Sequence, residues 1–195
     1  IPLRLVGSEM CIRDRMDIVP TELLLSELTT QVAQSYYHWL FLAQPSPFPE
    51  KLISADPDYF YESCLLGWGA ASLDGFEREK LSQYRKSWNN LDTIRAMCDD
   101  YRAAIHFDWD LDKKDQNRCL GVPACVMWGK TGAMAKHYDV PATWRKNFSN
   151  IEKKPMNGGH FFPDQYPQET VSALASFISN NLSLIHISEP TRRRG

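Results

Sequence analysis

Residues 122–129 read VPACVMWG, a short and continuously apolar run that ends at a glycine. Such a run is typical of a strand buried on both faces of a parallel sheet. A helical pattern follows over 140–148, then a weaker strand at 151–156 and a closing helix at 168–178. This alternation of strands and helices predicts that the second part of the chain folds as an α/β sheet.

Upstream of this run, residues 21–118 have a helical pattern rich in aromatic side chains. The predicted helices cover 22–42, 56–67 with Asp56 as N-cap and Pro57 in the first turn, 76–88, and 92–105 with Asp92 as N-cap. Residues 108–118 are very polar and predict a solvated helix or loop. Two parallel strands do not form a stable sheet alone. We therefore expect a two-stranded remnant with an open edge along 122–128, and further strands before Met16.

The composition restricts the class of protein. The chain has 195 residues, of which 43% are hydrophobic and 24% charged, which excludes a disordered chain or a coiled-coil rod. A formal net charge of −2 gives no reason to expect a nucleic-acid partner. The N-terminal apolar patch is interrupted by Glu9 and Asp14, and no apolar run is long enough for a membrane span, so we expect neither a signal peptide nor a membrane partner.

Cysteine and histidine spacing bears on cofactors and location. Five cysteines without a CxxC pair indicate reduced thiols and predict a cytoplasmic protein. His38, His106, His137 and His160 are scattered along the chain, so no metal site is predicted. No glycine-rich phosphate loop is present either, and we expect no cofactor.

The two ends of the chain have related coding sequences. One codon choice for residues 10–14, followed by AG, is ATG TGT ATA AGA GAC AG. Its reverse complement, CTG TCT CTT ATA CAC AT, encodes the Leu-Ser-Leu-Ile-His that begins at Leu182. The pattern resembles inverted transposon ends ligated to DNA for sequencing. We therefore interpret 1–15 and 182–195 as adaptor-derived tails; residues 16–181 alone carry 16 basic and 21 acidic side chains, a net charge of −5.

Several side chains are candidates for chemistry. His160 follows two glycines after a predicted strand, which suits a general base on a loop, although the local pattern alone favours an exposed loop histidine. Asp17 precedes a helix and could orient that histidine or only cap the helix. His38, Trp39 and Tyr101 offer N–H and O–H donors, but the local pattern alone favours core packing.

Motifs along 16–181 resemble the C-terminal part of the fluoroacetate (haloacetate) dehalogenases, a family of α/β hydrolases. The matching segments are Tyr37-His38-Trp39, Phe41-Leu42-Ala43-Gln44-Pro45, Pro49-Glu50, Asp56-Pro57-Asp58, Met97-Cys98-Asp99-Asp100-Tyr101-Arg102-Ala103, Trp128-Gly129 and Gly159-His160-Phe161. The His-Trp and Cys-Asp-Asp-Tyr-Arg segments are specific to this family, whereas the last two are general features of the superfamily.

The resemblance implies an α/β fold, namely the C-terminal fragment of an α/β hydrolase: a helical cap plus the last two parallel strands and their helices. It implies that 16–20 end the sixth strand, 21–118 form the cap and 119–181 belong to the core. His160 matches the catalytic base and Asp17 the triad acid. Residues 128–133 contain no alternative acid. His38, Trp39 and Tyr101 match the halide-binding trio.

In this family an aspartate attacks the carbon that bears the halogen and forms an ester, which water then hydrolyses. The nucleophile precedes the triad acid, where this chain has only tail sequence, so no nucleophile is assigned and the chain as given is expected to be inactive. The resemblance also implies a small haloacid substrate, such as fluoroacetate converted to glycolate, and a homodimer for the full-length protein.

Two other functions remain open at this stage. An epoxide hydrolase has the same Asp–His–Asp machinery and a similar cap, but it needs two cap tyrosines, of which Tyr101 is one candidate. A non-catalytic binding protein of the same fold would not need both Asp17 and His160.

Overall fold

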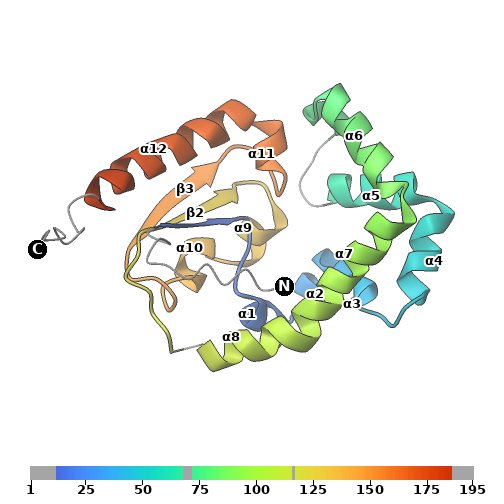
Figure 1. Cartoon of the computed structure of the whole chain (residues 1–195), viewed down its shortest axis with the longest axis horizontal. Coiled ribbons are helices and arrows are strands. Elements are labelled where there is room, and N and C mark those ends of the chain that lie inside the picture. The colour runs from blue at the N-terminus through green and yellow to red at the C-terminus, as the bar shows by residue number, and fades with distance from the viewer. Residues whose placement is uncertain (1–11, 68–71, 116, 186–195) are drawn as a thin grey trace, which may run out of the picture.

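Three parallel strands form the centre of the fold. The computed structural model describes residues 12–67, 72–115 and 117–185 (Figure 1). The strands are β1 (Arg13–Met16), β2 (Ala124–Gly129) and β3 (Ile151–Met156), in the spatial order β1-β2-β3. Met16 pairs with Met127, and Gly129 with Met156, so all three strands end at the same edge of the sheet.

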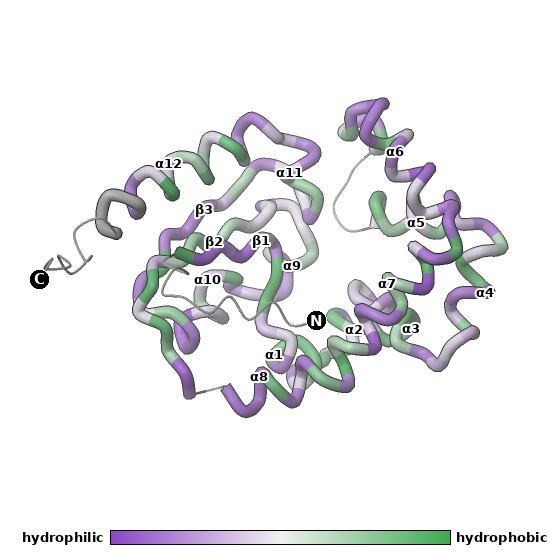
Figure 2. Tube along the Cα trace, viewed as in Figure 1, coloured by the Kyte–Doolittle hydropathy of each residue, from purple (hydrophilic) through white to green (hydrophobic). Residues whose placement is uncertain are grey.

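The central strand β2 explains the apolar run in the sequence. Cys125 and Met127 pack against one layer, which includes the long helix α12 (Pro167–Ile185) and the short helix α11 (Phe162–Gln165). Ala124 and Val126 point to the opposite layer. Because both faces of β2 are covered, it has no polar side; in Figure 2 it lies between the more hydrophilic β1 and β3.

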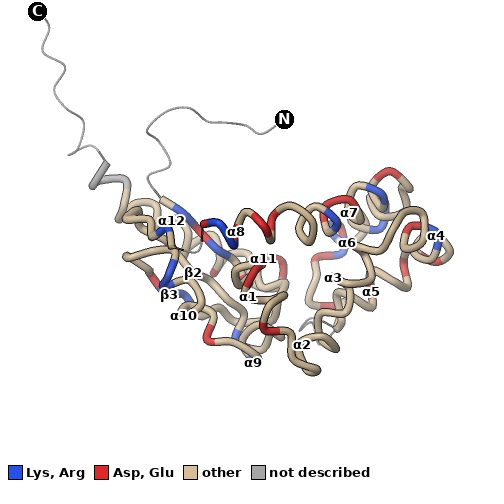
Figure 3. Tube along the Cα trace, turned by 90° about the horizontal axis from the view of Figure 1, so that it is seen from below, with Lys and Arg blue, Asp and Glu red and all other residues tan. Residues whose placement is uncertain are grey.

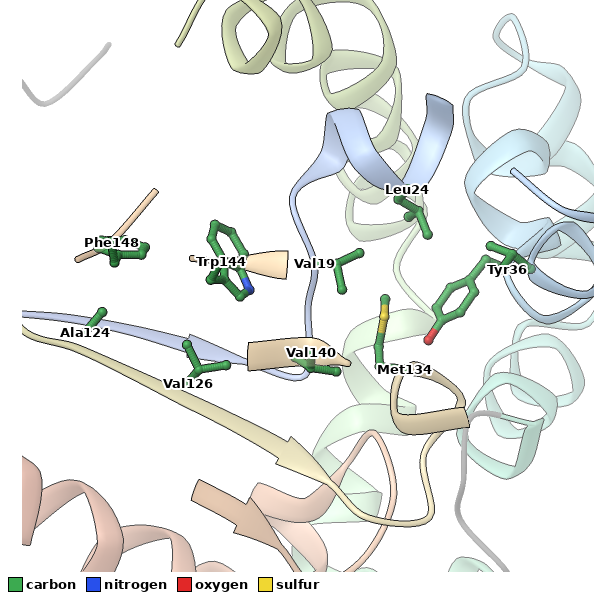
Figure 4. Close-up of a cluster of buried hydrophobic side chains, with 10 residues drawn as sticks. Val19, Leu24, Tyr36, Ala124, Val126, Met134, Val140, Trp144 and Phe148 are labelled. Carbon is green, nitrogen blue, oxygen red and sulfur yellow. The ribbon is translucent and has the colours of Figure 1, made fainter. Parts of the chain in front are cut away.

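The second layer contains the main hydrophobic cluster. Figure 4 shows side chains from the segment after β1, from β2 and from the helices α9 (Ala133–His137) and α10 (Val140–Thr143) meeting on one face of the sheet. The indole N–H of Trp144 donates to the carbonyl of Ile18 at 2.8 Å, which fixes the segment that follows β1.

Helices occupy the chain between β1 and β2. They are α1 (Thr21–Ser26), α2 (Thr30–Ser35), α3 (Tyr37–Leu42), α4 (Phe48–Ala55), α5 (Pro57–Gly67), the 3-10 turn η1 (Leu73–Gly75), α6 (Arg78–Trp88), α7 (Leu91–Ala103), the π-helical turn η2 (Ala104–Asp108) and α8 (Trp109–Asp115). Helices α3–α7 gather to one side of the sheet, while α8 lies beside α1 (Figure 1). Acidic and basic side chains are interspersed along α4 and α7 (Figure 3).

Several predicted helix boundaries are wrong. The helix expected over 22–42 is divided into three, because Glu27 and Tyr36 leave the helical conformation and Thr29 caps α2 by accepting from the Val32 amide. Asn90, rather than Asp92, caps α7. The helix expected over 140–148 ends at Thr143. The N-cap at Asp56 is confirmed, since its side chain accepts from the Tyr59 amide.

The expectation of two strands is also wrong. Arg13, Asp14 and Arg15, which we assigned to the N-terminal tail, extend the segment before Asp17 into β1 and occupy the edge of β2 that was expected to be open. Strand pairing uses backbone groups, so a segment of any composition next to Met16 is able to pair there. Helix α12 likewise continues to Ile185, past the expected start of the C-terminal tail.

The assignment of both tails to adaptor DNA stays a prediction, and residues 1–11 and 186–195 lie outside the described residues. Within the described part of the chain, no helix combines the length and the apolar character needed to cross a bilayer.

Candidate active site

The candidate site lies at the edge where the three parallel strands end. Asp17 follows β1, Gly129 ends β2, and the loop from Gly158 to His160 follows β3. In open α/β sheets, ligands bind at this carboxyl edge. The sheet therefore brings together two residues that are 143 positions apart in the chain, Asp17 and His160.

Asp17 is held rigidly. It is 1% exposed, and its φ of 47° lies in the left-handed region, where aspartate is one of the few tolerated residues. One carboxylate oxygen, Oδ1, accepts a hydrogen bond from the Gly129 amide at 3.0 Å, and Oδ2 accepts from Nδ1 of His160 at 2.7 Å. Each carboxylate oxygen therefore accepts one hydrogen bond, which ties Asp17 both to the end of β2 and to the His160 ring.

The loop before His160 has the backbone path that the two glycines predicted. Gly158 has a φ of +92°, and a Cβ there would lie 2.4 Å from the side-chain oxygen of Gln165. That same oxygen accepts from the Gly159 amide at 2.9 Å. The His160 side chain is 29% exposed. Because its Nδ1–H donates to Asp17, Nε2 is the nitrogen able to accept a proton.

Gly129 has a role that the sequence analysis missed. A Cβ at this position would lie 2.0 Å from the Gly159 carbonyl oxygen, whereas nothing lies within 4 Å of a Cβ at Gly121. Because Gly129 has no side chain, the end of β2 and the His160 loop lie close together. The backbone amide of Gly129 donates a hydrogen bond to Asp17. The signal in the sequence was the glycine that ends the apolar strand.

Gly129→Ala is expected to destabilise the chain by about 1–3 kcal/mol, since backbone must move to relieve the overlap. The matched variant Gly121→Ala should change the free energy of unfolding by less than about 0.5 kcal/mol. Urea denaturation of both variants measures the difference. Equal stabilities would mean that the two strand ends are not packed as described.

The predicted halide-binding residues come together above this edge. His38 and Trp39 lie on α3, and Tyr101 lies on α7. The His38 and Trp39 rings contact the Tyr101 ring edge to face, with centroids 5.6 and 5.4 Å apart. His38 is 2% exposed. The structure thus gathers two N–H groups and one O–H group from two helices into one cluster.

The electrostatics of the cluster keep it neutral. Burial, together with a smaller effect of the nearby His160 imidazole, lowers the pKa of His38 to about 3. Burial also raises the pKa of Tyr101 to about 12. Across neutral pH, the His38 ring is therefore uncharged and keeps one N–H, and Tyr101 keeps its O–H. Both groups can donate a hydrogen bond. The influence of His160 on His38 also places the cluster beside the Asp17–His160 pair.

The depressed pKa of His38 has a consequence for stability. Below the ordinary histidine pKa of about 6.5, His38 binds a proton in the unfolded chain, whereas in the folded chain it does so only near pH 3. The free energy of unfolding should therefore fall as the pH is lowered from about 6.5 to 4. His38→Gln should reduce this slope by up to about 1.4 kcal/mol per pH unit. Denaturation at pH 4 to 7 tests this, and identical slopes for both proteins would contradict it.

Two further residues near the pair gave no clear signal in the sequence. Tyr36 is buried, and burial together with the Asp17 carboxylate raises its pKa, which places the phenol close to that acid. A Cβ at Gly132 would lie 3.1 Å from the His160 amide. Among the described residues, no cluster of three or more His, Cys, Asp or Glu could hold a metal ion.

Three features define the C-terminal part of an α/β-hydrolase fold. They are the order of the parallel strands, the helices between β1 and β2, and the Asp–His pair at the strand ends. An α/β hydrolase from Nostoc sp. has the same fold at 35% identity, with a TM-score of 0.82 over 86% of this chain and 57% of that protein. An epoxide hydrolase from Pseudomonas aeruginosa is 28% identical, with a TM-score of 0.80 over 89% of this chain and 58% of that one.

The chain is a homologue of a fluoroacetate dehalogenase from Burkholderia sp., to which it is 43% identical over 174 residues. This confirms the resemblance found in the sequence. The match covers 89% of this chain but only 57% of that protein, so the chain spans little more than half the length of its relative. No protein-family model matches the chain.

Proposed function

We propose that the chain is part of a hydrolase that cleaves the carbon–halogen bond of haloacetates, with fluoroacetate converted to glycolate. The observation that supports this most is the neutral donor cluster of His38, Trp39 and Tyr101 beside the Asp17–His160 pair. A departing fluoride loses strong hydration, which fixed donors replace without a counter-charge.

The proposed reaction has two steps. A nucleophilic carboxylate forms a C–O bond to the substrate carbon while the electron pair of the C–halogen bond leaves with the halide, and the donor cluster receives that halide. Water then attacks the carbonyl carbon of the ester, His160 Nε2 takes the proton of that water, and Asp17 stabilises the imidazolium. The bond from the carbonyl carbon to the glycolate oxygen breaks, the imidazolium returns its proton, and glycolate leaves with the nucleophilic carboxylate regenerated. In this scheme Asp17 holds His160, and the nucleophile comes from polypeptide upstream of Asp17, as the resemblance implies.

The test uses the parent gene and the 195-residue chain in parallel. We expect the complete protein to release fluoride from fluoroacetate with one glycolate per fluoride, and the chain alone to release none above background. Fluoride-electrode measurement and chromatography of the product decide this. A complete protein that releases no halide from fluoroacetate or chloroacetate would refute the proposal, and halide release by the chain alone would refute the assignment of the nucleophile.

Epoxide hydrolysis is the second candidate. It is favoured by two cap tyrosines, Tyr61 on α5 and Tyr101 on α7, which line the same cavity, because a pair of tyrosines can bind an epoxide oxygen. The same purified protein is assayed with styrene oxide. Diol formation without halide release would favour this candidate.

We also propose a small haloacid as the substrate, without a metal, a cofactor, or a nucleic-acid or membrane partner, and a homodimer in the cytoplasm for the complete protein. Size-exclusion chromatography with light scattering tests the dimer.

A further inference from the structure

Arg102 follows Tyr101 directly on α7 and joins this helix to two other elements. Its Nε donates to the carbonyl oxygen of Gln44 at 2.9 Å, and its Nη2 donates to Oε1 of Glu50 at 2.7 Å. Gln44 comes just after the end of α3, and Glu50 lies in the first turn of α4. One guanidinium therefore links the helix that carries Tyr101 to the helix that carries the other two members of the donor cluster.

The groups around this guanidinium are themselves fixed. The side chains of Glu50 and Arg102 are 4% and 17% exposed, so their ion pair is only weakly screened by solvent. The Gln44 side chain donates back to the Leu40 carbonyl of α3 at 2.8 Å, which ties the segment after α3 to that helix. Asp99, one turn before Arg102 on α7, accepts from its Nη1 at 2.7 Å. Each nitrogen of the guanidinium therefore has one defined partner.

Apolar packing alone does not define how these helices sit against one another. Both α3 and α4 contact α7 (Figure 1), and Leu42, Ile53, Ile94 and Cys98 form a shared buried cluster. Burial of apolar surface is non-directional, so it favours contact without selecting one register. A planar guanidinium that donates to two elements at once has a fixed geometry. Its hydrogen bonds therefore select the position of α7 against α3.

We propose that Arg102, paired with Glu50, is a positioning residue for halide binding, because it fixes the gap between α3 and α7 and thus the spacing of the three donors. We call this pair the Arg102 clamp. Fluoride is the smallest and most strongly hydrated halide, so it needs close donors, whereas chloride depends less on them. The clamp therefore favours fluoride as the leaving group. This inference rests on the proposed function, because it assigns the departing halide to the donor cluster.

The first test measures turnover of the complete protein with fluoroacetate and chloroacetate. Arg102→Met should lower kcat for fluoride release at least about 10-fold, since small displacements of positioned groups are costly. It should lower kcat for chloride release less than about 3-fold and leave both KM values within about 2-fold, because the donors act on a charge that develops in the transition state. Arg102→Lys keeps the charge opposite Glu50 but has a single nitrogen, so it should recover part of the fluoride rate.

Arg85→Met is the matched control. Arg85 forms the same kind of pair with Glu62, with Nη2 2.6 Å from Oε1, but this pair joins α6 to α5. The control should keep the ratio of fluoride to chloride turnover within about 2-fold.

A double-mutant cycle separates positioning from a general structural role. In a Trp39→Phe background, Arg102→Met should lower fluoride release less than about 3-fold, because both changes act through the same donors. An undiminished effect would overturn the clamp. If Arg102→Met does not fold, because the buried Glu50 carboxylate has lost its cation, the variant Glu50→Gln/Arg102→Met removes both charges. It should show the same loss of fluoride preference.

The second test uses the 195-residue chain and needs no reaction. The Trp39 and Tyr101 rings are perpendicular, with centroids 5.4 Å apart, so the ring current of Tyr101 makes the chemical shift of the Trp39 indole N–H sensitive to their separation. Arg102→Met should shift this NMR signal, and Arg85→Met should leave it in place. Trp39→Phe identifies the signal by its loss.

An indole signal that does not move in Arg102→Met, or an unchanged ratio of fluoride to chloride turnover, would overturn the clamp. These results are separable from the proposed function. Fluoride release by the complete protein with an unchanged ratio refutes the clamp alone. A shifted indole signal in the chain, with no halide release by the complete protein, refutes the function while the link between α3 and α7 holds.

Discussion

His160→Gln in the complete protein should stop turnover after a single event. The ester step does not use His160, so the variant is expected to release about one fluoride per active site in a burst. Steady-state release should then fall by about 10²–10⁴-fold, the usual contribution of a general base. Rapid-quench fluoride measurement gives the burst, and mass spectrometry of the quenched protein detects the covalently attached two-carbon acid.

The control for this variant is His106→Gln. His106 is exposed on η2 and takes no part in the site, so its replacement should leave turnover within about 2-fold. If His160→Gln keeps full steady-state turnover, the base lies elsewhere. If it loses the burst as well, His160 acts before the ester forms, and the two-step scheme is wrong.

Trp39→Phe should discriminate between halides. The substitution removes the indole N–H but keeps an aromatic ring against Tyr101. Loss of one preorganised donor costs about 10²-fold or more when charge develops strongly. Fluoride is the poorer leaving group, so we expect fluoride release to fall about 100-fold and chloride release less than about 10-fold, measured as kcat with the two haloacetates.

The matched variant is Trp109→Phe. It removes the same group from α8, where the indole nitrogen is buried without a hydrogen bond among the described residues. It should therefore not alter the ratio of fluoride to chloride turnover. Equal losses for both halides in Trp39→Phe would argue that Trp39 only packs the cap.

The parts of the fold that could be predicted are those set by local pattern. The apolar run at β2 predicted a strand covered on both faces because its side chains have no polar alternation. The boundaries of β3 were also recovered from the sequence. The division of 22–42 into three helices was not predictable from hydrophobic spacing, because it depends on backbone turns at Glu27 and Tyr36.

The candidate site was only partly visible in the sequence. Asp17 and His160 stood out by their positions after strands, and the structure brings them within hydrogen-bond distance. Gln165 did not stand out, since a hydrogen bond from its side chain to the Gly159 amide leaves no pattern in residue types, and Gly129 was seen only as the end of an apolar strand. The catalytic and halide-binding roles of these residues stay predictions until the variants are measured.

The helix from α7 through η2 to α8 has a practical consequence for protein engineering. Its first part contacts α3, which carries His38 and Trp39, and also contacts α4; its last part contacts α1, which begins four residues after Asp17. A continuous run of helix therefore connects the element that carries Tyr101 of the donor cluster with the helix that follows Asp17. A chimaera that exchanges caps between relatives should keep α7, η2 and α8 together. Its junction should therefore lie after Asp115, at the end of α8.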